Sequence, residues 1–313
     1  MTKSPRVTVV GSSMVDLVSY LERCPAPGET VFGKNFAQGF GGKGANQAAM
    51  AALLGAQVRF VTCIGRDAFT QGWLDHFADF GIDAGDVAIL DGIPSGVASV
   101  WVSPEGENMI VLCAGANTHL DSSRVARAFA AAAPAHVVLS QLEVPQSAVA
   151  EGFRRGKEQG AITILNPGPA AALEPELVAV TDWLLPNETE LRLLASSMGG
   201  FTGDDDIALA KQLADALGID VIVTLGARGA AGAVRGSAAF EVAAPVVTAV
   251  DTTGAGDAFA GTFAYALGAG LPVIDAVRLA VAVSADSVTK FGTAVSFSRG
   301  DELQSICKSE AFS

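Results

Sequence analysis

The chain has 313 residues, of which 50% are hydrophobic, and this is enough for one large domain with a substantial core. Its formal net charge of −13 repels nucleic-acid phosphates and anionic lipid surfaces, so we expect a small-molecule partner and neither nucleic acid nor a membrane. Its apolar runs stay below the roughly 18 residues of a membrane span, and the first is too short for a signal peptide. The four cysteines are widely separated, which argues against a local metal site and fits reduced thiols in a soluble cytoplasmic protein.

Short runs rich in Val, Ile and Leu alternate with helix-length segments along most of the chain. Such runs suit strands that are buried on both faces of a parallel sheet. We expect strands at residues 6–11, 58–63, 136–140, 161–165, 182–185 and 221–225. We expect helices at residues 45–54, 69–80, 122–131, 145–159, 205–217 and 258–267. The alternation predicts an α/β fold with a mostly parallel sheet and helices on both of its faces.

Two regions interrupt this alternation. Residues 30–40 and 97–112 have the pattern of strands joined by turns, and the turn of the second region is centred on residues 104–107. They could pair into a small sheet outside the main one and cover a site. We therefore expect a single domain over residues 1–313, with a β lid from about residues 12–40 and 95–113, since no repeat or linker marks a second domain.

The strongest local motif is the glycine-rich segment 251–257, which leads into an apolar helical segment. A glycine turn before a helix offers free backbone N–H groups and the positive end of the helix dipole to an anion. Asp257 falls in the first helical turn, where its carboxylate can take a proton from an attacking hydroxyl. The amides of Gly254, Ala255 and Gly256 would meanwhile stabilise a transferring phosphoryl group. The alternative is an aspartate that only caps the helix.

A second glycine-rich segment, residues 39–47, also leads into a helix. It matches G-x-G-x-x-G but follows an expected lid strand, so its context does not suit a dinucleotide site. Gly44 also stands where a phosphate-binding Walker A loop requires Ser or Thr. Lys43 and Asn46 can instead offer hydrogen bonds to a small ligand, and the alternative is a simple hinge.

Two further segments follow expected strands at the edge of the sheet where open α/β folds bind ligands. In residues 186–190, Glu188 or Glu190 could help to hold hydrated Mg²⁺, although two acidic residues here are also typical of helix capping. Residues 224–229 could border a nucleotide or simply reverse the chain.

Taken together and in this order, these motifs resemble the ribokinase-like (PfkB) family of carbohydrate kinases, from about residue 9 to residue 298. The other matching segments are Gly11-Ser12 with Asp16, PGETV at 27–31, GAN at 115–117, QLE at 141–143 and NP at 166–167. The resemblance implies a ribokinase-like α/β fold whose β lid closes over the sugar and forms a homodimer interface. It also implies ATP-dependent phosphorylation of a pentose, most simply D-ribose to its 5-phosphate, with Mg²⁺ and an activating K⁺.

The resemblance also assigns residues to roles, with Asp257 as the catalytic base beside the amides of Gly254, Ala255 and Gly256. The residues that it places against the sugar are Met14, Asp16, Gly42, Lys43, Gly44, Asn46, Glu143 and Asp257. Those that it places on the nucleotide side are Asn187, Thr224, Leu225, Gly226, Ala227, Arg228, Gly229 and Gly256, with Glu190 near Mg²⁺. The ligands that it implies for the monovalent cation, mostly through backbone oxygens, are Asp251, Thr253, Ser287, Lys290, Gly292 and Ser296.

Met14 is a departure that concerns the choice of sugar. Members that act on ribose commonly have an asparagine here, which pairs with a ribose hydroxyl and so rejects the deoxy sugar. An apolar side chain imposes no such penalty, and the segment 11–17 also resembles the deoxyribose-specific branch of the family. We rank ribose ahead of 2-deoxyribose, and the alternative for Met14 is that it packs under the lid and touches no sugar.

Other functions remain open at this stage. Within the family, the acceptor could be another sugar or a nucleoside. A sensor that binds without turnover would have no need of a base at Asp257. A dinucleotide-dependent oxidoreductase is disfavoured because the first strand ends in Gly11-Ser12-Ser13-Met14, without the paired glycines that a pyrophosphate requires.

Overall fold

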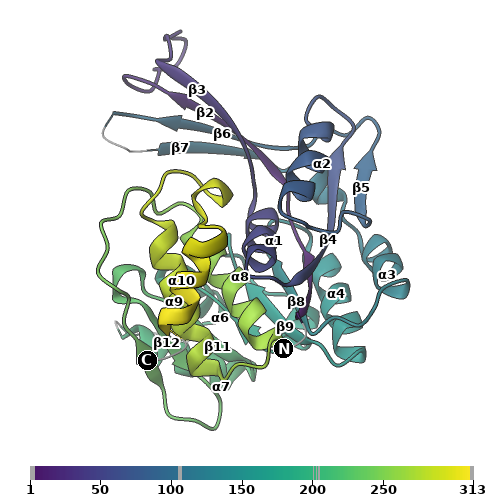
Figure 1. Ribbon diagram of the computed structural model, residues 1–313, viewed down its shortest axis with the longest axis vertical. Coiled ribbons are helices and arrows are strands. Elements are labelled where there is room, and N and C mark those ends of the chain that lie inside the picture. The colour runs from purple at the N-terminus through teal and green to yellow at the C-terminus, as the bar shows by residue number, and fades with distance from the viewer. Residues whose placement is uncertain (1–3, 105–107, 200, 202, 204, 311–313) are drawn as a thin grey trace.

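The computed structural model describes residues 4–104, 108–199, 201, 203 and 205–310, which form two β-sheets with helices packed around the larger one (Figure 1). Within these residues the large sheet has nine strands in the order β13-β12-β11-β10-β9-β8-β1-β4-β5. They are β1 (Arg6–Val10), β4 (Gln57–Gly65), β5 (Val87–Leu90), β8 (Val137–Gln141), β9 (Ile162–Asn166), β10 (Trp183–Leu184), β11 (Asp220–Thr224), β12 (Ala230–Ala233) and β13 (Phe240–Val242). Neighbouring strands pair in parallel except at β11–β12 and β12–β13. The expected mostly parallel α/β sheet is confirmed.

Helices cover both faces of the large sheet, because successive strand side chains point to opposite sides. In β1, Val7 and Val9 belong to a core shared with α1, α2, α8, α9 and α10, whereas Val10 belongs to a core shared with α3 to α7. The helices are α1 (Lys43–Leu53), α2 (Thr70–Asp79), α3 (Ser122–Ala130), α4 (Gln146–Glu158), α5 (Pro175–Val178), α6 (Glu188–Met198), α7 (Asp206–Leu217), α8 (Ala255–Gly268), α9 (Val273–Ser287) and α10 (Gly300–Glu310). Among them, within the described ranges, none is both long and apolar enough to cross a membrane.

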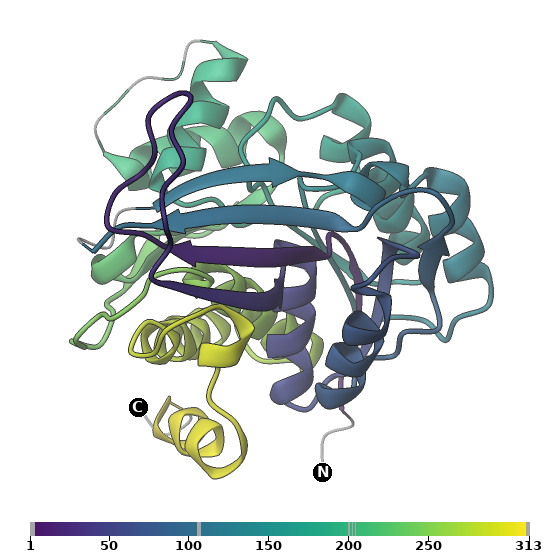
Figure 2. The same ribbon diagram turned by 90° about the horizontal axis from the view of Figure 1, so that it is seen from above.

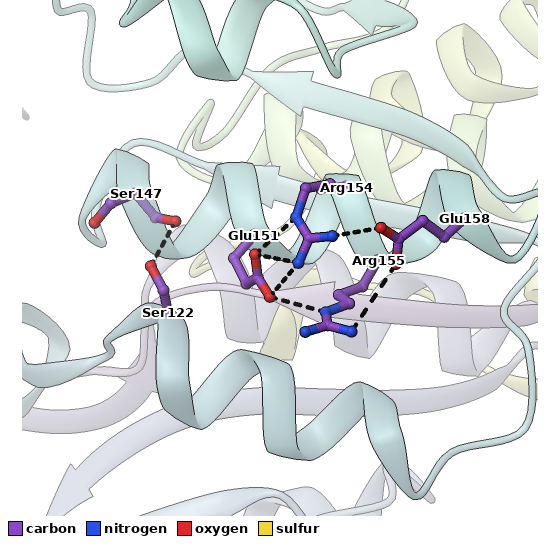
Figure 3. Close-up of polar contacts among 6 residues, drawn as sticks. All are labelled: Ser122, Ser147, Glu151, Arg154, Arg155 and Glu158. Atoms are coloured by element: carbon purple, nitrogen blue, oxygen red, sulfur yellow. Dashed lines mark hydrogen bonds and ion pairs between the residues drawn. The ribbon is translucent and has the colours of Figure 1, made fainter.

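Helices α3 and α4 lie side by side on one face and carry polar contacts of a purely structural kind (Figure 3). Ser122 Oγ at the start of α3 donates to the Ser147 carbonyl in α4 at 3.0 Å. Farther along α4, Arg154 and Arg155 both pair with Glu151, at 2.7 and 2.8 Å. Exposed pairs of this type contribute only about 0 to 1 kcal/mol each, so this network stabilises a helix surface modestly.

A second, smaller sheet stands apart from the large one, with its strands side by side (Figures 1 and 2). In the described part of the chain it has four strands in the order β3-β2-β6-β7, namely β2 (Met14–Tyr20), β3 (Asn35–Gly41), β6 (Gly96–Val102) and β7 (Asn108–Cys113). The two regions expected to form a small sheet both contribute to it, but they do not pair directly, because β2 lies between β3 and β6. Residues 30–34 precede β3, and residues 105–107 of the expected turn lie outside the described residues.

Candidate active site

The candidate site forms where strands β8 and β9 end and helices α1 and α8 begin. Gln141 is the last residue of β8 and Asn166 is the last of β9, so both stand at the carboxyl edge of the sheet. Lys43 begins α1, and Asp257 lies in the first turn of α8. A cavity at this edge is lined by Lys43, Asn166, Leu185, Asn187, Glu190, Thr224, Gly256 and Phe259.

The Asp257 side chain is buried and is held by two amide groups from α1. Its Oδ2 accepts from Asn46 Nδ2 at 2.9 Å, and its Oδ1 accepts from Gln47 Nε2 at 3.0 Å. The alternative of a helix-capping aspartate is wrong, because the N-cap of α8 is Gly254 and no described side chain caps it. Asn46 Oδ1 has no partner among the described residues and is left to accept a hydrogen bond from a ligand.

The turn before α8 is shaped by a glycine. Gly254 has φ of 82°, a left-handed conformation that other residues adopt at a cost. Gly256 lines the cavity, and a Cβ atom there would meet nothing within 4 Å. The Ala255 N–H donates to the Thr252 carbonyl at 3.3 Å. It is therefore partly engaged already, and the Gly256 N–H is the one that belongs to a residue lining the cavity.

Glu143 joins the start of α1 to the end of β1. Its Oε2 accepts from Ser12 Oγ at 2.5 Å and from the Lys43 N–H at 3.0 Å. Ser12 Oγ in turn accepts from the Gly44 N–H at 3.2 Å. A Cβ atom at Gly44 would lie 2.4 Å from Ser12 N, so this glycine allows the helix to approach the strand. Burial raises the pKa of Glu143 above its usual value, and the hydrogen bonds from Ser12 and Lys43 offset only part of this rise.

The Lys43 ammonium is the positive charge of the site. The negative charge of Asp257 raises the pKa of Lys43, burial opposes this, and Glu143 and Glu190 reinforce it. Lys43 therefore stays protonated at neutral pH despite its burial, and it can neutralise an anion in the cavity that it lines.

Asp16 approaches the same group from β2 of the small sheet. Burial, and then the negative charges of Glu143 and Asp257, raise its pKa to about 6. A Cβ atom at Gly41 of β3 would lie 2.3 Å from Asp16 Oδ2, so the strand pair leaves room for this carboxylate only because position 41 is glycine. A carboxylate in this position is an acceptor suited to sugar hydroxyl groups.

Met14 lies at the start of β2 and is buried, at 3% exposure. Its Sδ lies 3.5 Å from Asn117 Nδ2, and a Cβ atom at Gly42 would be 3.3 Å from Met14 Cγ. The structure thus brings Met14 beside Gly42 of the expected sugar-contact set while packing its thioether against Asn117.

On the nucleotide side, Asn187 and Glu190 form a capping box at the start of α6. Asn187 Oδ1 accepts from the Glu190 N–H at 2.8 Å, and Glu190 Oε2 accepts from the Asn187 N–H at 3.0 Å. Asn187 and Glu190 therefore cap α6, as the capping interpretation of this segment predicts. Both residues also line the cavity with Lys43, and the isolated β-bridge from Asn187 to Thr224 brings the end of β11 to the same place.

Residues 224–229 do not all face this cavity. Thr224 lines it, but the Leu225 side chain is 3% exposed and belongs to a hydrophobic core. The Arg228 guanidinium turns to two carboxylates, at 2.6 Å from both Glu188 Oε1 and Asp206 Oδ2. Gly226 and Ala227 form the short 3₁₀ turn with Arg228, and Gly229 ends it.

The residues expected to bind a monovalent cation converge in part. Asp251 accepts from the Thr253 N–H at 2.9 Å and from the Gly292 N–H at 3.0 Å. Burial raises the pKa of Asp251, but the hydrogen bonds from Thr253 and Gly292 lower it by more, so this pKa lies below its usual value. Ser287 and Ser296, which flank Gly292 in the sequence, are both buried.

The Lys290 side chain does not join this group. Its Nζ donates to Ser298 Oγ at 2.6 Å and to Glu302 Oε1 at 2.9 Å, so only its backbone oxygen remains for a cation. Among the described residues there is no cluster of three or more His, Cys, Asp or Glu suited to a metal ion.

Three amide residues of the site were not singled out as functional by the sequence analysis. Gln47, Gln141 and Asn166 are all buried within one hydrogen-bonded group that ends on Asp257. The available signal was the family resemblance, because Gln47 ends the glycine-rich segment 39–47, Gln141 begins the segment QLE and Asn166 begins the segment NP.

Comparison with known proteins finds relatives along nearly the whole chain. The family model for the pfkB family carbohydrate kinases matches residues 4–299. A ribokinase from Haemophilus influenzae is 38% identical over 288 residues, which cover 91% of this chain and 93% of the relative. A deoxyribokinase from Salmonella typhi is 37% identical over 294 residues, covering 93% and 95%. The structure of an Arabidopsis thaliana ribokinase complexed with ribose and ATP has a TM-score of 0.86 and 32% identity, covering 99% of this chain and 100% of that one.

Proposed function

Because the chain belongs to the pfkB family of carbohydrate kinases, we propose that it transfers the γ-phosphoryl group of ATP to the primary hydroxyl of a pentose, with D-ribose as the leading substrate. The Haemophilus influenzae ribokinase and the Arabidopsis thaliana ribokinase with ribose and ATP support this pair of substrates. The products would be D-ribose 5-phosphate and ADP.

The observation that carries the proposal is the Asp257 carboxylate, held by two amides next to the glycine turn that begins α8. As the sugar oxygen attacks the γ-phosphorus, the new O–P bond forms and the bond from that phosphorus to the β-phosphate oxygen breaks. The hydroxyl proton passes to Asp257, and ADP leaves. Lys43 and the free N–H groups at the start of α8 offset the charge on the transferring group.

The sugar would lie between the end of the small sheet and the start of α1. Asp16 and Glu143 supply carboxylate acceptors there, and Asn46 Oδ1 is a buried acceptor without a partner among the described residues. These acceptors match the hydroxyl donors of a free sugar, and they favour a sugar over an apolar acceptor.

Mg²⁺ and K⁺ are part of the proposal, and the residues present fit both. Glu190 and Asn187 would hold hydrated Mg²⁺, which neutralises phosphate charge when bound; one Glu190 oxygen is already used in the capping box, so contact through water suits it. Asp251, with a lowered pKa and an ionised carboxylate, and the oxygens of Thr253 and Gly292 would hold K⁺.

We also propose that the small sheet is the lid of a single domain and forms a homodimer interface. Four consecutive apolar residues of its edge strand β7, Met109 to Leu112, are each more than half exposed, and Phe36 of β3 is 59% exposed. A contiguous apolar surface on an edge strand is costly for a monomer, and a second copy of the same sheet would cover it.

A cytoplasmic location completes the proposal. ATP is abundant there, and all four cysteines, which lie in the described part of the chain, are free thiols. Cell fractionation against compartment markers tests it.

The experiment that tests the function is a coupled ADP-release assay with ATP and Mg²⁺, run on D-ribose and 2-deoxy-D-ribose, with and without K⁺. ADP release that depends on ribose and rises with K⁺ supports the proposal. No ADP release with any pentose would favour a sugar sensor or a kinase of another acceptor such as a nucleoside.

The second candidate substrate is 2-deoxy-D-ribose, and Met14 favours it. The thioether at this position is only a weak acceptor and already faces Asn117 Nδ2, so it offers little to a 2-hydroxyl. The Salmonella typhi deoxyribokinase is nearly as similar to this chain as the ribokinase is. A higher kcat/KM for the deoxy sugar would make it the preferred substrate.

A further inference from the structure

We propose that Gln47 is a positioning residue for the catalytic base, and that Gln141 and Asn166 orient it for this role. Nothing in the motif analysis or in the names of the relatives assigns a function to Gln47. The inference rests on the proposed role of Asp257, and it adds to that role the element that fixes the direction of the Asp257 carboxylate.

The contacts form one continuous chain from the ends of two strands to the base. Gln141 Nε2 at the end of β8 donates to Gln47 Oε1 at 2.5 Å. Gln47 Nε2 donates to Asn166 Oδ1 at 3.1 Å and to Asp257 Oδ1 at 3.0 Å. Asn166 Nδ2 donates onward to the Leu185 carbonyl at 2.9 Å.

The chain of contacts permits one orientation of the Gln47 amide. Asn166 must present its oxygen to Gln47, because its nitrogen is bound to the Leu185 carbonyl. If the Gln47 amide were reversed, its oxygen would face both Asn166 Oδ1 and Asp257 Oδ1, and three acceptors would meet without a proton between them. Gln141 fixes the same orientation from the other side by donating to Gln47 Oε1.

Burial makes this arrangement rigid. Gln47 and Gln141 are both 0% exposed, and Asp257 is 5% exposed, so water cannot replace a missing donor without a cavity to hold it. With Asn46 on Oδ2 and Gln47 on Oδ1, each carboxylate oxygen has one fixed donor, and the carboxylate plane cannot rotate.

The effect on catalysis follows from this geometry. Without the Gln47 donor, the carboxylate can turn about its bond to Cβ and lose its alignment with the sugar hydroxyl, which lowers the rate of the proton-transfer step. Glu143 is held by Ser12 and the Lys43 N–H and not by Gln47 or Asp257, and Asp16 lies on β2 of the small sheet. These two carboxylates, which are expected to bind the sugar, keep their places, so KM for the sugar should change little. A loss confined to kcat is therefore the signature of positioning.

The test uses the full-length protein with Gln47→Met, which keeps the length of the side chain but has no N–H donor, and Gln47→Leu, which also lacks the donor and has no polar group. Each is made alone and together with Asp257→Asn. We expect both single variants to lower kcat about 10- to 100-fold, with KM for ribose within about threefold of wild type. We expect neither to lower the residual activity of Asp257→Asn any further, because both changes act through the same group.

Thr262→Val is the matched control, since Thr262 lies in α8, is fully buried, and has an Oγ1 without a partner among the described residues. It should leave kcat unchanged. A thermal unfolding curve for each variant separates damage to the fold from damage to the site. If the Gln47 variants do not fold, Gln141→Met removes the donor to Gln47 Oε1 and should give a smaller loss of kcat, again absent in the Asp257→Asn background.

Two results overturn the inference while leaving the proposed function intact. One is a folded Gln47→Met protein with kcat within about twofold of wild type. The other is a loss that multiplies with that of Asp257→Asn, because independent effects would mean that Gln47 acts elsewhere. Near-wild-type turnover in Asp257→Asn itself would instead remove the base from the proposed function, and the positioning role with it.

Discussion

Met14 Sδ lies 3.5 Å from Asn117 Nδ2, so the residue on which the expected choice of sugar depends faces a buried amide. Asn117 also donates to the carbonyls of Ser13 and Ala114 at 2.9 Å. It accepts from the Ser13 N–H at 2.9 Å as well, so the start of β2 is fixed.

Replacing Met14 with asparagine should therefore change the choice of sugar. The new amide can pair with the 2-hydroxyl of ribose but is left buried and unpaired with 2-deoxyribose. We expect the ratio of kcat/KM for ribose over deoxyribose to rise about tenfold or more. Met14→Leu, which conserves volume and adds no polar group, should leave the ratio within about twofold. An unchanged ratio in Met14→Asn would show that Met14 only packs under the small sheet.

Asp257→Asn should lower kcat by about 10³-fold or more while the protein stays folded, because the amide cannot accept the hydroxyl proton. Asp257 accepts two hydrogen bonds, and an asparagine amide can accept at only one end. We therefore also expect a loss of about 1 to 2 kcal/mol in the free energy of unfolding. ADP-release kinetics and thermal unfolding measure the two effects. Turnover near that of the wild type in a folded variant would contradict the assigned role.

The fold was predictable where the sequence pattern is local and repeated. The strands at the centre of the sheet are apolar on both faces, as Val9 and Val10 show by pointing into opposite cores, and their Val-rich runs mark them. Strand β12, Ala230–Ala233, was missed because its small residues carry no strand pattern, and its antiparallel position is set by pairing with β11. The expected ribokinase-like fold is confirmed by the solved relatives.

The site was predictable only in part, because only some of its residues are neighbours in the sequence. Asp257 could be proposed from the sequence because the glycine turn and the helix start that surround it are adjacent along the chain. Of its two donors, Asn46 was expected in the site, but Gln47 was not, since Gln47 is 210 residues away and meets Asp257 only when α1 packs against α8. Arg228 lies in the expected nucleotide loop, but its partner Asp206 belongs to another helix, and no local pattern indicates that pairing.

The pH dependence of stability should reveal Asp16. An aspartate in the unfolded chain titrates near 3.9, whereas burial together with Glu143 and Asp257 raises the pKa of Asp16 to about 6 in the fold. Between these values the folded protein retains a proton that the unfolded chain has lost. The contribution of Asp16 to the free energy of unfolding is therefore greatest below about pH 4, falls as pH rises to about 6, and is lower by at most about 3 kcal/mol above that.

Asp16→Asn removes this titration, so it should flatten the loss of stability between pH 4 and 6 and be more stable than the wild type at pH 8. The same change should raise KM for ribose about 10- to 100-fold, because a charged acceptor for sugar hydroxyls is lost. Thermal unfolding over a pH series and steady-state kinetics measure the two effects. A variant that is less stable than the wild type at pH 8 would contradict the electrostatic origin of the effect.

The exposed apolar residues of β7 lead to a prediction about assembly. Ile110 and Val111 point to opposite faces of the small sheet, and they are 51% and 58% exposed. If a second copy covers one of these faces, a lysine on that face must be buried against an apolar partner, and the dimer should dissociate about 100-fold more readily. We expect Ile110→Lys or Val111→Lys, whichever lies on the covered face, to convert a dimer to a monomer in light scattering at micromolar concentration.

Val246→Lys is the control, because Val246 is fully exposed outside both sheets and its change should leave the dimer intact. A monomeric wild type, or dimers that persist in both β7 variants, would mean that the sheet does not hold two copies together.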